Sequence, residues 1–489
     1  MCIHRKMIRT LFTLIAVFIS YSAIPGDLDS NQKTKAVVKI ITESLTPDYI
    51  YPWQVGSTEQ SSGTGVIIEN NYILTAAHVV DNNISIYIRK PGSDKRFKTD
   101  IKYISDASDL AILTVKDGGF FRGTTPIKLG KLPKLGDEII TWGFPEGGSQ
   151  LAITKGIVSR IDFDEYAHSK QKNLVTQIDA AVNAGASGGP AIVDGMLAGI
   201  TFQALDGEEI ENIGYVVPIP VIEQFLYDVK DGKVDGVPAI AIKTQNMRNP
   251  QLRAAYKMKT EMTGTLVVQN ITEPEAGENT IKTDDVLLEI DGLPVGNDGS
   301  VPFISGDRID LNYFFTKYQL GDAIPIRLLR NGNEKLIDYT FKYTNSDIML
   351  VTRHFSGFVP DYEILAGLVF QELSYDYLVT SFGEEDYPSW MLNVYHDYKK
   401  AWNRIEKAVF LSTILPDEIN IDYDDFEDRR VVSVNGNKVD NLDDFRKAIK
   451  NNNKKFHSIQ FDKPSNKILL SKKYIHERES IIKERYNVD

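Results

Sequence analysis

The chain has 489 residues, of which 42% are hydrophobic and 10% aromatic, and its formal net charge is −12. A chain of this length is expected to hold roughly three domains. The composition excludes disordered, collagenous and low-complexity classes. The acidic balance disfavours a nucleic-acid binder, which needs a basic face to neutralise phosphates. The one cysteine, Cys2, excludes a disulfide framework, an iron–sulfur cluster and a cysteine zinc site.

The first 23 residues have the pattern of a secretory signal peptide. Basic residues between Arg5 and Arg9 precede a short apolar run at 11–19, and small residues lead up to Ala23. This run is shorter than the roughly 20 residues that span a bilayer. We therefore expect export and removal of the peptide, with a periplasmic or secreted destination and no integral membrane segment afterwards. An uncleaved membrane anchor is the alternative.

Two sets of short β-rich runs, at 35–115 and 138–226, alternate with turns and contain few long helical patterns. This organisation predicts an all-β barrel or sandwich region. A helix is expected at 219–229, followed by a polar, glycine-containing linker at 230–237. The predicted β domain therefore covers 35–229.

A weak internal repeat follows the linker. Residues 286–295 and 430–439 both predict a strand, a tight turn at Gly292 or Gly436, and a second strand. Each is followed by a candidate helix, at 308–319 and 441–450. The repeat predicts two related modules at 238–345 and 360–470. The charged tail at 471–489 is expected to be a solvated helix or a frayed end.

Three residues combine into a candidate site for acyl transfer, which needs a hydroxyl nucleophile, a base and a carboxylate that orients the base. His78 ends one apolar run, Asp109 opens another, and Ser187 lies in the glycine-rich turn 183–190. Their order, His–Asp–Ser, is that of chymotrypsin-like double β-barrels. We therefore expect a catalytic cleft between two barrels, with Asp106 as the competing carboxylate.

The glycine-rich turn also predicts an oxyanion hole. Such a hole needs backbone N–H groups aimed at one point, and Gly185, Ala186 and Ser187 are the candidate donors. No histidine pair has ligand spacing, so neither a metal nor another cofactor is expected. The other six histidines, His168 among them, have no motif around them and are expected to be packed or solvated.

Several segments resemble the HtrA/Deg family of serine proteases: TAAHVV (75–80), SDLAILTV (108–115), QIDAAVNAGASGGPAI (177–192) and GYVVPIP (214–220). Two more, DDVLLEIDGLPVGNDG (284–299) and AGLVF (366–370), are similar to the plant-type Deg branch with a divergent second PDZ domain. The resemblance implies a mainly β chain with α+β modules, in which a chymotrypsin-like double β-barrel precedes two PDZ-like domains. It also implies an ATP-independent endopeptidase of protein quality control that degrades unfolded or misfolded proteins and is assembled from trimers. Where the family usually has Asn before the serine, this chain has Ala186, so an inactive chaperone or peptide-binding scaffold is the alternative.

The resemblance further implies where peptides bind. The substrate is expected to pair with 199–203, in a modest apolar pocket formed by Ala184, Thr201, Phe202 and Gln203. A C-terminal peptide is expected at a loop and strand of the first PDZ module, formed by Met262, Thr263, Gly264, Thr265 and Leu266; an ordinary buried strand is the alternative. The aromatic segment 48–53 is expected to form a trimer contact or to fold onto its own barrel.

Overall fold

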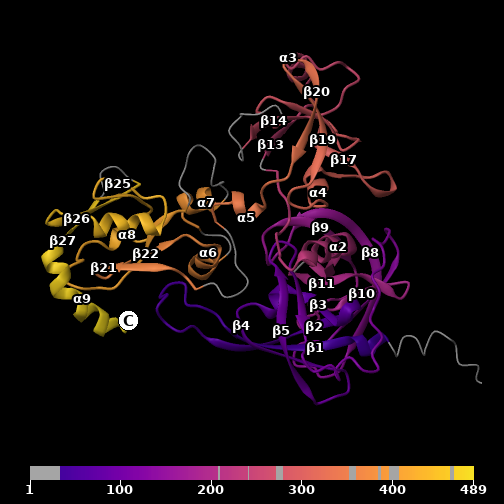
Figure 1. Cartoon of the computed structure of the whole chain (residues 1–489), viewed down its shortest axis with the longest axis horizontal. Coiled ribbons are helices and arrows are strands. Elements are labelled where there is room, and N and C mark those ends of the chain that lie inside the picture. Colours follow the sequence, from indigo (N-terminus) through magenta and orange to yellow (C-terminus); the bar gives the residue numbers. More distant parts are fainter. Residues whose placement is uncertain are drawn as a thin grey trace, which may run out of the picture.

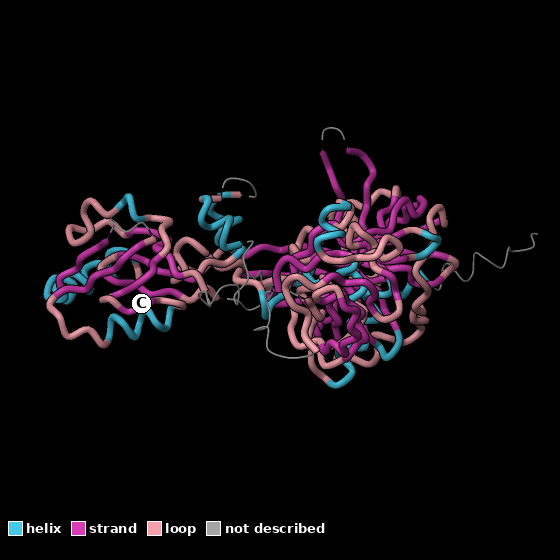
Figure 2. The backbone as a smooth tube through the Cα atoms, turned by 90° about the horizontal axis from the view of Figure 1, so that it is seen from above, coloured by secondary structure: helices cyan, strands magenta, loops and turns pink. Residues whose placement is uncertain are grey.

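The computed structural model describes residues 33–207, 210–240, 242–270, 279–351, 359–383, 387–395, 407–462 and 467–488, without the side chains of 203–212 and 305. Figure 1 shows a barrel body, a second module above it and a C-terminal module to one side. Seen from above in Figure 2, the C-terminal module extends from the barrel body along the long axis. Within these ranges no helix is long and apolar enough to cross a bilayer. The predicted signal peptide lies outside the described residues.

The first barrel is a closed, antiparallel sheet in the order β1-β2-β3-β6-β5-β4. Closure pairs both edges of every strand, which removes exposed sheet edges. Valine, isoleucine and leucine side chains fill its interior, as expected for strands rich in these residues. Its strands are β1 (Val37–Leu45), β2 (Thr58–Ile68), β3 (Tyr72–Ala76), β4 (Asn83–Arg89), β5 (Arg96–Ser105) and β6 (Leu110–Thr114).

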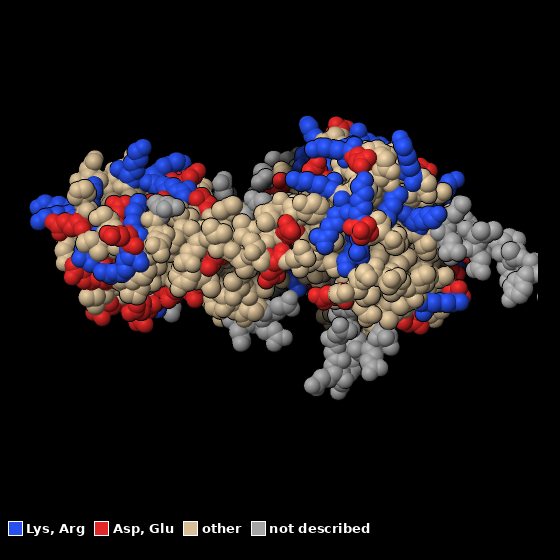
Figure 3. Space-filling model, turned by 90° about the horizontal axis from the view of Figure 1, so that it is seen from below, with Lys and Arg blue, Asp and Glu red and all other residues tan. Residues whose placement is uncertain are grey.

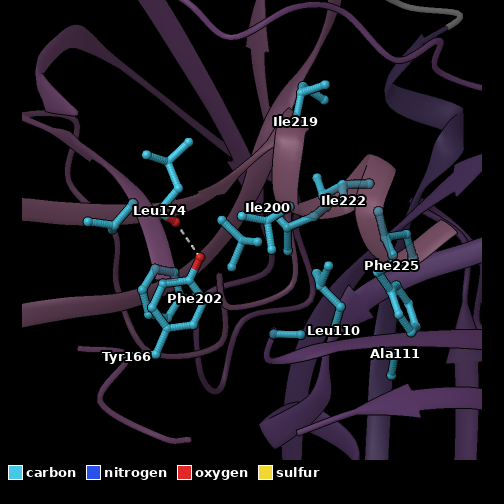
Figure 4. Packing of buried hydrophobic residues seen from close by; sticks show 14 of the residues in the cluster. Leu110, Ala111, Tyr166, Leu174, Ile200, Phe202, Ile219, Ile222 and Phe225 are labelled. Carbon is cyan, nitrogen blue, oxygen red and sulfur yellow. Dashed lines mark hydrogen bonds between the residues drawn. The ribbon is translucent and has the colours of Figure 1, made fainter. Parts of the chain in front are cut away.

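The second barrel closes in the order β10-β11-β12-β9-β8-β7. Helix α2 (Ile219–Asp228) follows it, where a helix is predicted, and has Pro220 in its first turn. In Figure 4, Ile222 and Phe225 of α2 point toward Leu110 and Ala111 of the first barrel, so the helix helps to join the two barrels. The strands are β7 (Glu138–Gly143), β8 (Ala152–Glu165), β9 (Lys172–Ile178), β10 (Pro190–Val193), β11 (Met196–Gly207) and β12 (Ile210–Pro218).

The second module is built on a sheet in the order β13-β14-β15-β19-β20, with β16 paired to β15. The helix expected at 308–319 is shorter, because 308–310 form strand β18, which pairs with β17. The Asp310 side chain then caps the helix by accepting the Asn312 N–H. The elements are β13 (Ile242–Asn246), α3 (Pro250–Ala255), β14 (Thr265–Asn270), β15 (Val286–Ile290), β16 (Leu293–Pro294), β17 (Ser300–Pro302), β18 (Arg308–Asp310), α4 (Leu311–Phe315), β19 (Ala323–Arg330), β20 (Asn333–Thr340) and α5 (Asn345–Ile348).

The C-terminal module has two sheets, β21-β22-β23 and β25-β24-β26-β27. Their shared core includes Phe370 and Phe445, whose ring centroids are 4.4 Å apart. The elements are β21 (Tyr362–Leu365), β22 (Leu368–Glu372), α6 (Tyr375–Phe382), α7 (Ser389–Tyr395), β23 (Val409–Ile414), β24 (Val431–Val434), β25 (Asn437–Lys438), α8 (Leu442–Lys450), β26 (Phe456–Phe461), β27 (Lys467–Ser471) and α9 (Lys472–Tyr486).

Of the two alternatives for the charged tail, the structure has the helix: α9 covers most of the segment and is attached to the C-terminal module. Ile482 is buried in a cluster with Leu415 and Val369. Arg478 donates two hydrogen bonds to the wholly buried carboxylate of Asp417. A buried apolar contact and a bidentate ion pair hold α9 in place, so it is not a frayed end.

The internal repeat is visible as two similar hairpins. In the first, Asp291 and Gly292 have positive φ values of 45° and 78°, and in the second Asn435 and Gly436 have 55° and 88°. Two consecutive left-handed residues fit the right-handed twist of a two-residue hairpin and favour Asp-Gly and Asn-Gly.

The β1–β2 connection reaches out of the first barrel to the C-terminal module (Figure 1). The Trp53 indole N–H donates to the Tyr486 carbonyl at 3.1 Å, and the Gln371 side-chain amide donates to the Tyr49 carbonyl at 3.0 Å. Neither expectation for the aromatic segment 48–53 included this contact, which lies between two distant parts of the same chain.

Charge is unevenly spread over the surface despite the net acidity. Figure 3 shows Lys and Arg side chains gathered on the barrel body, on the face seen from below.

Candidate active site

His78 and Asp109 form a tightly bonded pair in the first barrel. His78 lies in the 3-10 turn 77–80 that follows β3, and Asp109 directly precedes β6. Asp109 is fully buried, and its Oδ2 accepts from His78 Nδ1 at 2.8 Å while Oδ1 accepts the His78 backbone N–H at 2.9 Å. The carboxylate that contacts His78 is therefore that of Asp109, not of the competitor Asp106. This arrangement fixes the imidazole tautomer and directs Nε2 away from the acid.

Asp109 has φ +50°, a left-handed conformation that Asp tolerates better than most residues. Its own carbonyl accepts the Ala77 N–H at 3.0 Å, which ties the two loops together. The pKa of Tyr166 is raised well above its usual range, mainly because the phenol is buried and also because the Asp109 charge lies nearby.

The serine loop 183–190 needs its glycines. Gly185 has φ +87°, and a Cβ there would lie 2.5 Å from the Phe144 carbonyl oxygen. Gly188 has φ +83°, and a Cβ there would lie 2.1 Å from the Thr64 carbonyl oxygen. A larger residue at Gly185 would force the loop away from the segment that follows β7, and one at Gly188 would force it away from the first barrel.

Carbonyl contacts set the direction of the loop's N–H groups, because C=O and N–H point opposite ways in a trans peptide. The Ala184 carbonyl accepts from Glu146 N at 2.7 Å, and the Ala186 carbonyl accepts from Thr201 Oγ1 at 2.8 Å. The N–H groups of Gly185 and Ser187 therefore point the other way, and neither forms a hydrogen bond within the described part of the chain. The Ala186 N–H donates to the Asn183 carbonyl at 2.9 Å, so it is occupied and is no oxyanion donor in this conformation.

Thr64 braces this loop, and the sequence prediction missed it. Its N–H donates to the Ser187 carbonyl and its hydroxyl to the Gly185 carbonyl, both at 2.8 Å. The hydroxyl also accepts the Phe144 N–H at 2.9 Å. Thr64 is completely buried in β2 and joins the barrels directly at the serine loop. Its flanking glycines, in Gly-Thr-Gly, are the local signal of this close approach.

The expected substrate pocket is partly wrong. Thr201 is fully buried with its hydroxyl on the serine loop. Phe202 is 1% exposed and packs against Tyr166 (Figure 4), and its ring also lies near that of Tyr215. Successive strand residues point to opposite faces, and here one face meets the serine loop while the other meets the barrel core. Ala184 is exposed, and the side chain of Gln203 lies outside the described residues.

His168, expected to be an ordinary packed or solvated residue, lies against the candidate base. It comes from the turn between β8 and β9, and its ring stacks on His78 with centroids 3.8 Å apart and planes inclined by 17°. No hydrogen bond joins His78 to the Ser187 hydroxyl in residues 33–207. Such bonds are often long without substrate and shorten in the reacting complex.

The expected peptide site of the second module is wrong. Thr265 and Leu266 are buried in β14, which is paired on one side to β13 and on the other to β15. The preceding segment is also held, since Arg253 donates to the Met262 carbonyl and Asn297 accepts the Gly264 N–H. Thr263 lies in the same held segment. A strand paired on both edges cannot receive a peptide as a further strand.

The edge strand of this sheet is β13. A cavity of about 300 Å³ lies beside it, and its lining includes residues of β13, α4, α5 and α7 and of the β8–β9 hairpin of the barrel body. The lining includes Ile240, Ile242, Phe315, Lys170 and Lys172.

Comparison with known proteins agrees with this architecture. Residues 63–200 match the family described as a trypsin-like peptidase domain, and 351–489 match the family described as a PDZ domain. Protease Do-like 2, chloroplastic, of Arabidopsis thaliana is 35% identical over 86% of this chain and 68% of its own length. Protease Do-like 4, mitochondrial, of the same plant is 35% identical over 83% and 75% of the two chains. A solved variant of the HtrA-type protease AlgW with a decapeptide has a similar fold, with a TM-score of 0.50, 19% identity, and coverage of 64% of this chain and 96% of its own.

Proposed function

Because this chain is a serine endopeptidase of the HtrA/Deg family, with plant-type Deg relatives and a C-terminal PDZ domain, we propose that it cleaves unfolded or misfolded proteins through Ser187, His78 and Asp109. The observation that carries the assignment is the buried Asp109 carboxylate on His78 Nδ1 at 2.8 Å. No cofactor is required for this chemistry.

The proposed reaction begins when His78 Nε2 takes the Ser187 hydroxyl proton and the serine oxygen attacks the peptide carbonyl. Asp109 stabilises the imidazolium that forms. The N–H groups of Gly185 and Ser187 bind the oxyanion of the tetrahedral intermediate. His78 then gives the proton to the leaving amine, which departs and leaves an acyl-enzyme. Water attacks this acyl group, with His78 acting again first as base and then as acid, and the acid product and free Ser187 are released.

We propose that C-terminal peptides bind to the second module at β13 rather than at β14. A peptide that adds to the edge of β13 would run through the cavity beside Ile242 and Phe315. Lys170 and Lys172 outnumber the one acidic residue of the lining, Glu165, and supply positive charge for a terminal carboxylate. Assembly from trimers stays a prediction.

The N-terminal segment is proposed to direct the protein into a separate compartment. The sequence predicts a secretory signal and a periplasm, whereas two relatives carry chloroplastic and mitochondrial in their names. A basic segment without acidic residues suits either kind of import. A reporter fused to residues 1–30 distinguishes these destinations by where it accumulates.

Casein degradation tests the proposed activity. Wild type should degrade unfolded casein without ATP, and Ser187→Ala should lose the activity while retaining the fold. If the wild type is as inert as Ser187→Ala, also after heating and with C-terminal peptides added, the alternative of a non-enzymatic scaffold is favoured instead.

A further inference from the structure

The stacked pair of His78 and His168 places two imidazoles at one point of the molecule. Both side chains are half-buried, and the ligand atoms of His78, His168 and Asp109 all lie within 4.8 Å of one another. The two histidines come from different barrels, which is why no sequence spacing reveals them. Neutral imidazole is a common ligand of zinc-class cations.

Asp109 already prepares His78 as a metal ligand. Histidines that bind metals commonly donate their other ring N–H to a carboxylate, which fixes the tautomer and raises the basicity of the free nitrogen. Asp109 Oδ2 occupies this outer position at 2.8 Å from His78 Nδ1. His78 Nε2 therefore keeps the lone pair that an ion would take.

We propose that His78 Nε2 and one ring nitrogen of His168 bind a zinc-class divalent cation, and that this ion switches off proteolysis. Zinc–nitrogen bonds of about 2.1 Å in a tetrahedral site put two ligand atoms roughly 3.4 Å apart. The ligand atoms of the two histidines already lie within 4.8 Å of each other, so a small side-chain movement brings them to that separation. A turn of the His168 ring out of the stack aims its lone pair at the ion, and water completes the coordination.

A cation bound to the His78 Nε2 lone pair blocks catalysis. The ion occupies the same His78 electrons that accept the Ser187 proton, so the metal-bound enzyme has no general base. Imidazole ligands favour Zn²⁺, Cu²⁺ and Ni²⁺, whereas Mg²⁺ and Ca²⁺ prefer oxygen ligands. Inhibition is therefore selective, and removal of the ion by a chelator restores activity. This inhibitory effect rests on the proposed function, but the binding of the ion does not.

The binding is tested on the full chain by calorimetric titration of Ser187→Ala with ZnCl₂. His168→Gln and His168→Phe in this background should weaken the tightest zinc site by at least about tenfold. His168→Phe keeps an aromatic ring in the stack, so it separates ligation from packing. His476→Gln removes an exposed histidine on α9 and should not change that site. Equal zinc affinity with and without His168 overturns the proposal.

The inhibition is tested on the active protein, with each variant compared with its own metal-free rate. Zn²⁺ should inhibit the wild type and EDTA should restore the rate, whereas His168→Phe should resist the same concentration. Equal inhibition of wild type and His168→Phe, or equal inhibition by Mg²⁺, refutes the inhibitory role. A protein that shows His168-dependent zinc binding but no protease activity would retain the metal site and refute the proposed function.

Discussion

The Thr64 hydroxyl offers the sharpest test of how the serine loop is held. Replacing Thr64 by Val keeps the shape of a fully buried side chain and removes its hydroxyl. The Phe144 N–H and the Gly185 carbonyl then both lose their partner. No water is expected to replace the hydroxyl, because the site is filled by the two barrels.

The expected effect has two parts. Each orphaned buried polar group costs about 1–3 kcal/mol, so the free energy of unfolding of the barrel body should fall by roughly 2–6 kcal/mol. That is a large share of the about 5–15 kcal/mol typical of a domain. Deleting an oxyanion donor costs about 10²–10³ in rate. In Thr64→Val the backbone that carries the Gly185 N–H is less firmly held but still present, so kcat should fall by about 10- to 100-fold.

The assay pairs urea unfolding with steady-state kinetics on a chromogenic peptide. Thr99→Val is the matched control, because Thr99 is buried in the first barrel and its hydroxyl donates to the Thr114 carbonyl at 2.7 Å, away from the serine loop. Thr99→Val should lower the free energy of unfolding by about 1–3 kcal/mol and leave kcat unchanged. Thr64→Ser should recover both quantities. A Thr64→Val protein with the kcat of Thr99→Val would show that the hydroxyl serves stability alone.

Three further outcomes are expected. Asp109→Asn leaves His78 in the wrong tautomer, so kcat on a peptide substrate should fall by about 10⁴ while the far-ultraviolet circular dichroism stays unchanged; a loss below tenfold would contradict the proposed role. Trp53→Ala removes the contact with Tyr486, so hydrogen exchange in α9 should speed up while exchange in β9 does not, and unchanged exchange in α9 would refute that contact. The hydrogen bond from Arg478 holds the pKa of Asp417 below its usual value, so the ionised form favours the folded state. Its stabilisation is present above about pH 4 and lost as the pH falls further. Arg478→Met should reduce this acid-dependent part of the unfolding free energy, while Arg485 still contacts Asp417, and an unchanged pH profile would speak against it.

The sequence predicted the strands and the acid–base pair because both are encoded locally. Alternating apolar runs set the strands; His78 follows one such run and Asp109 directly precedes another. The double barrel, the protease class and the C-terminal PDZ domain are confirmed. Thr64 and His168 were missed because their roles depend on contacts between barrels, which no local pattern records.

The peptide strand was misassigned for a related reason. The sequence identified β14 from a glycine turn before an apolar run, and β14 is indeed a strand. Which strand lies at the edge depends on the order of the whole sheet, and that order places β13 outermost. Phe202 was likewise identified as part of a strand, but burial in the barrel decided its role.

The contact between Trp53 and Tyr486 also bears on how the protein is made. The two residues are separated by 433 positions in the chain. At a synthesis rate of about 5–20 residues per second, roughly 20–90 s pass between the appearance of one partner and the other. Once the chain has passed β6, and until α9 is made, the β1–β2 connection extends from a barrel that has its strands but not its docking site. A ribosome stalled before α9 would therefore hold a nascent chain whose aromatic segment is exposed to chaperones and to neighbouring nascent chains.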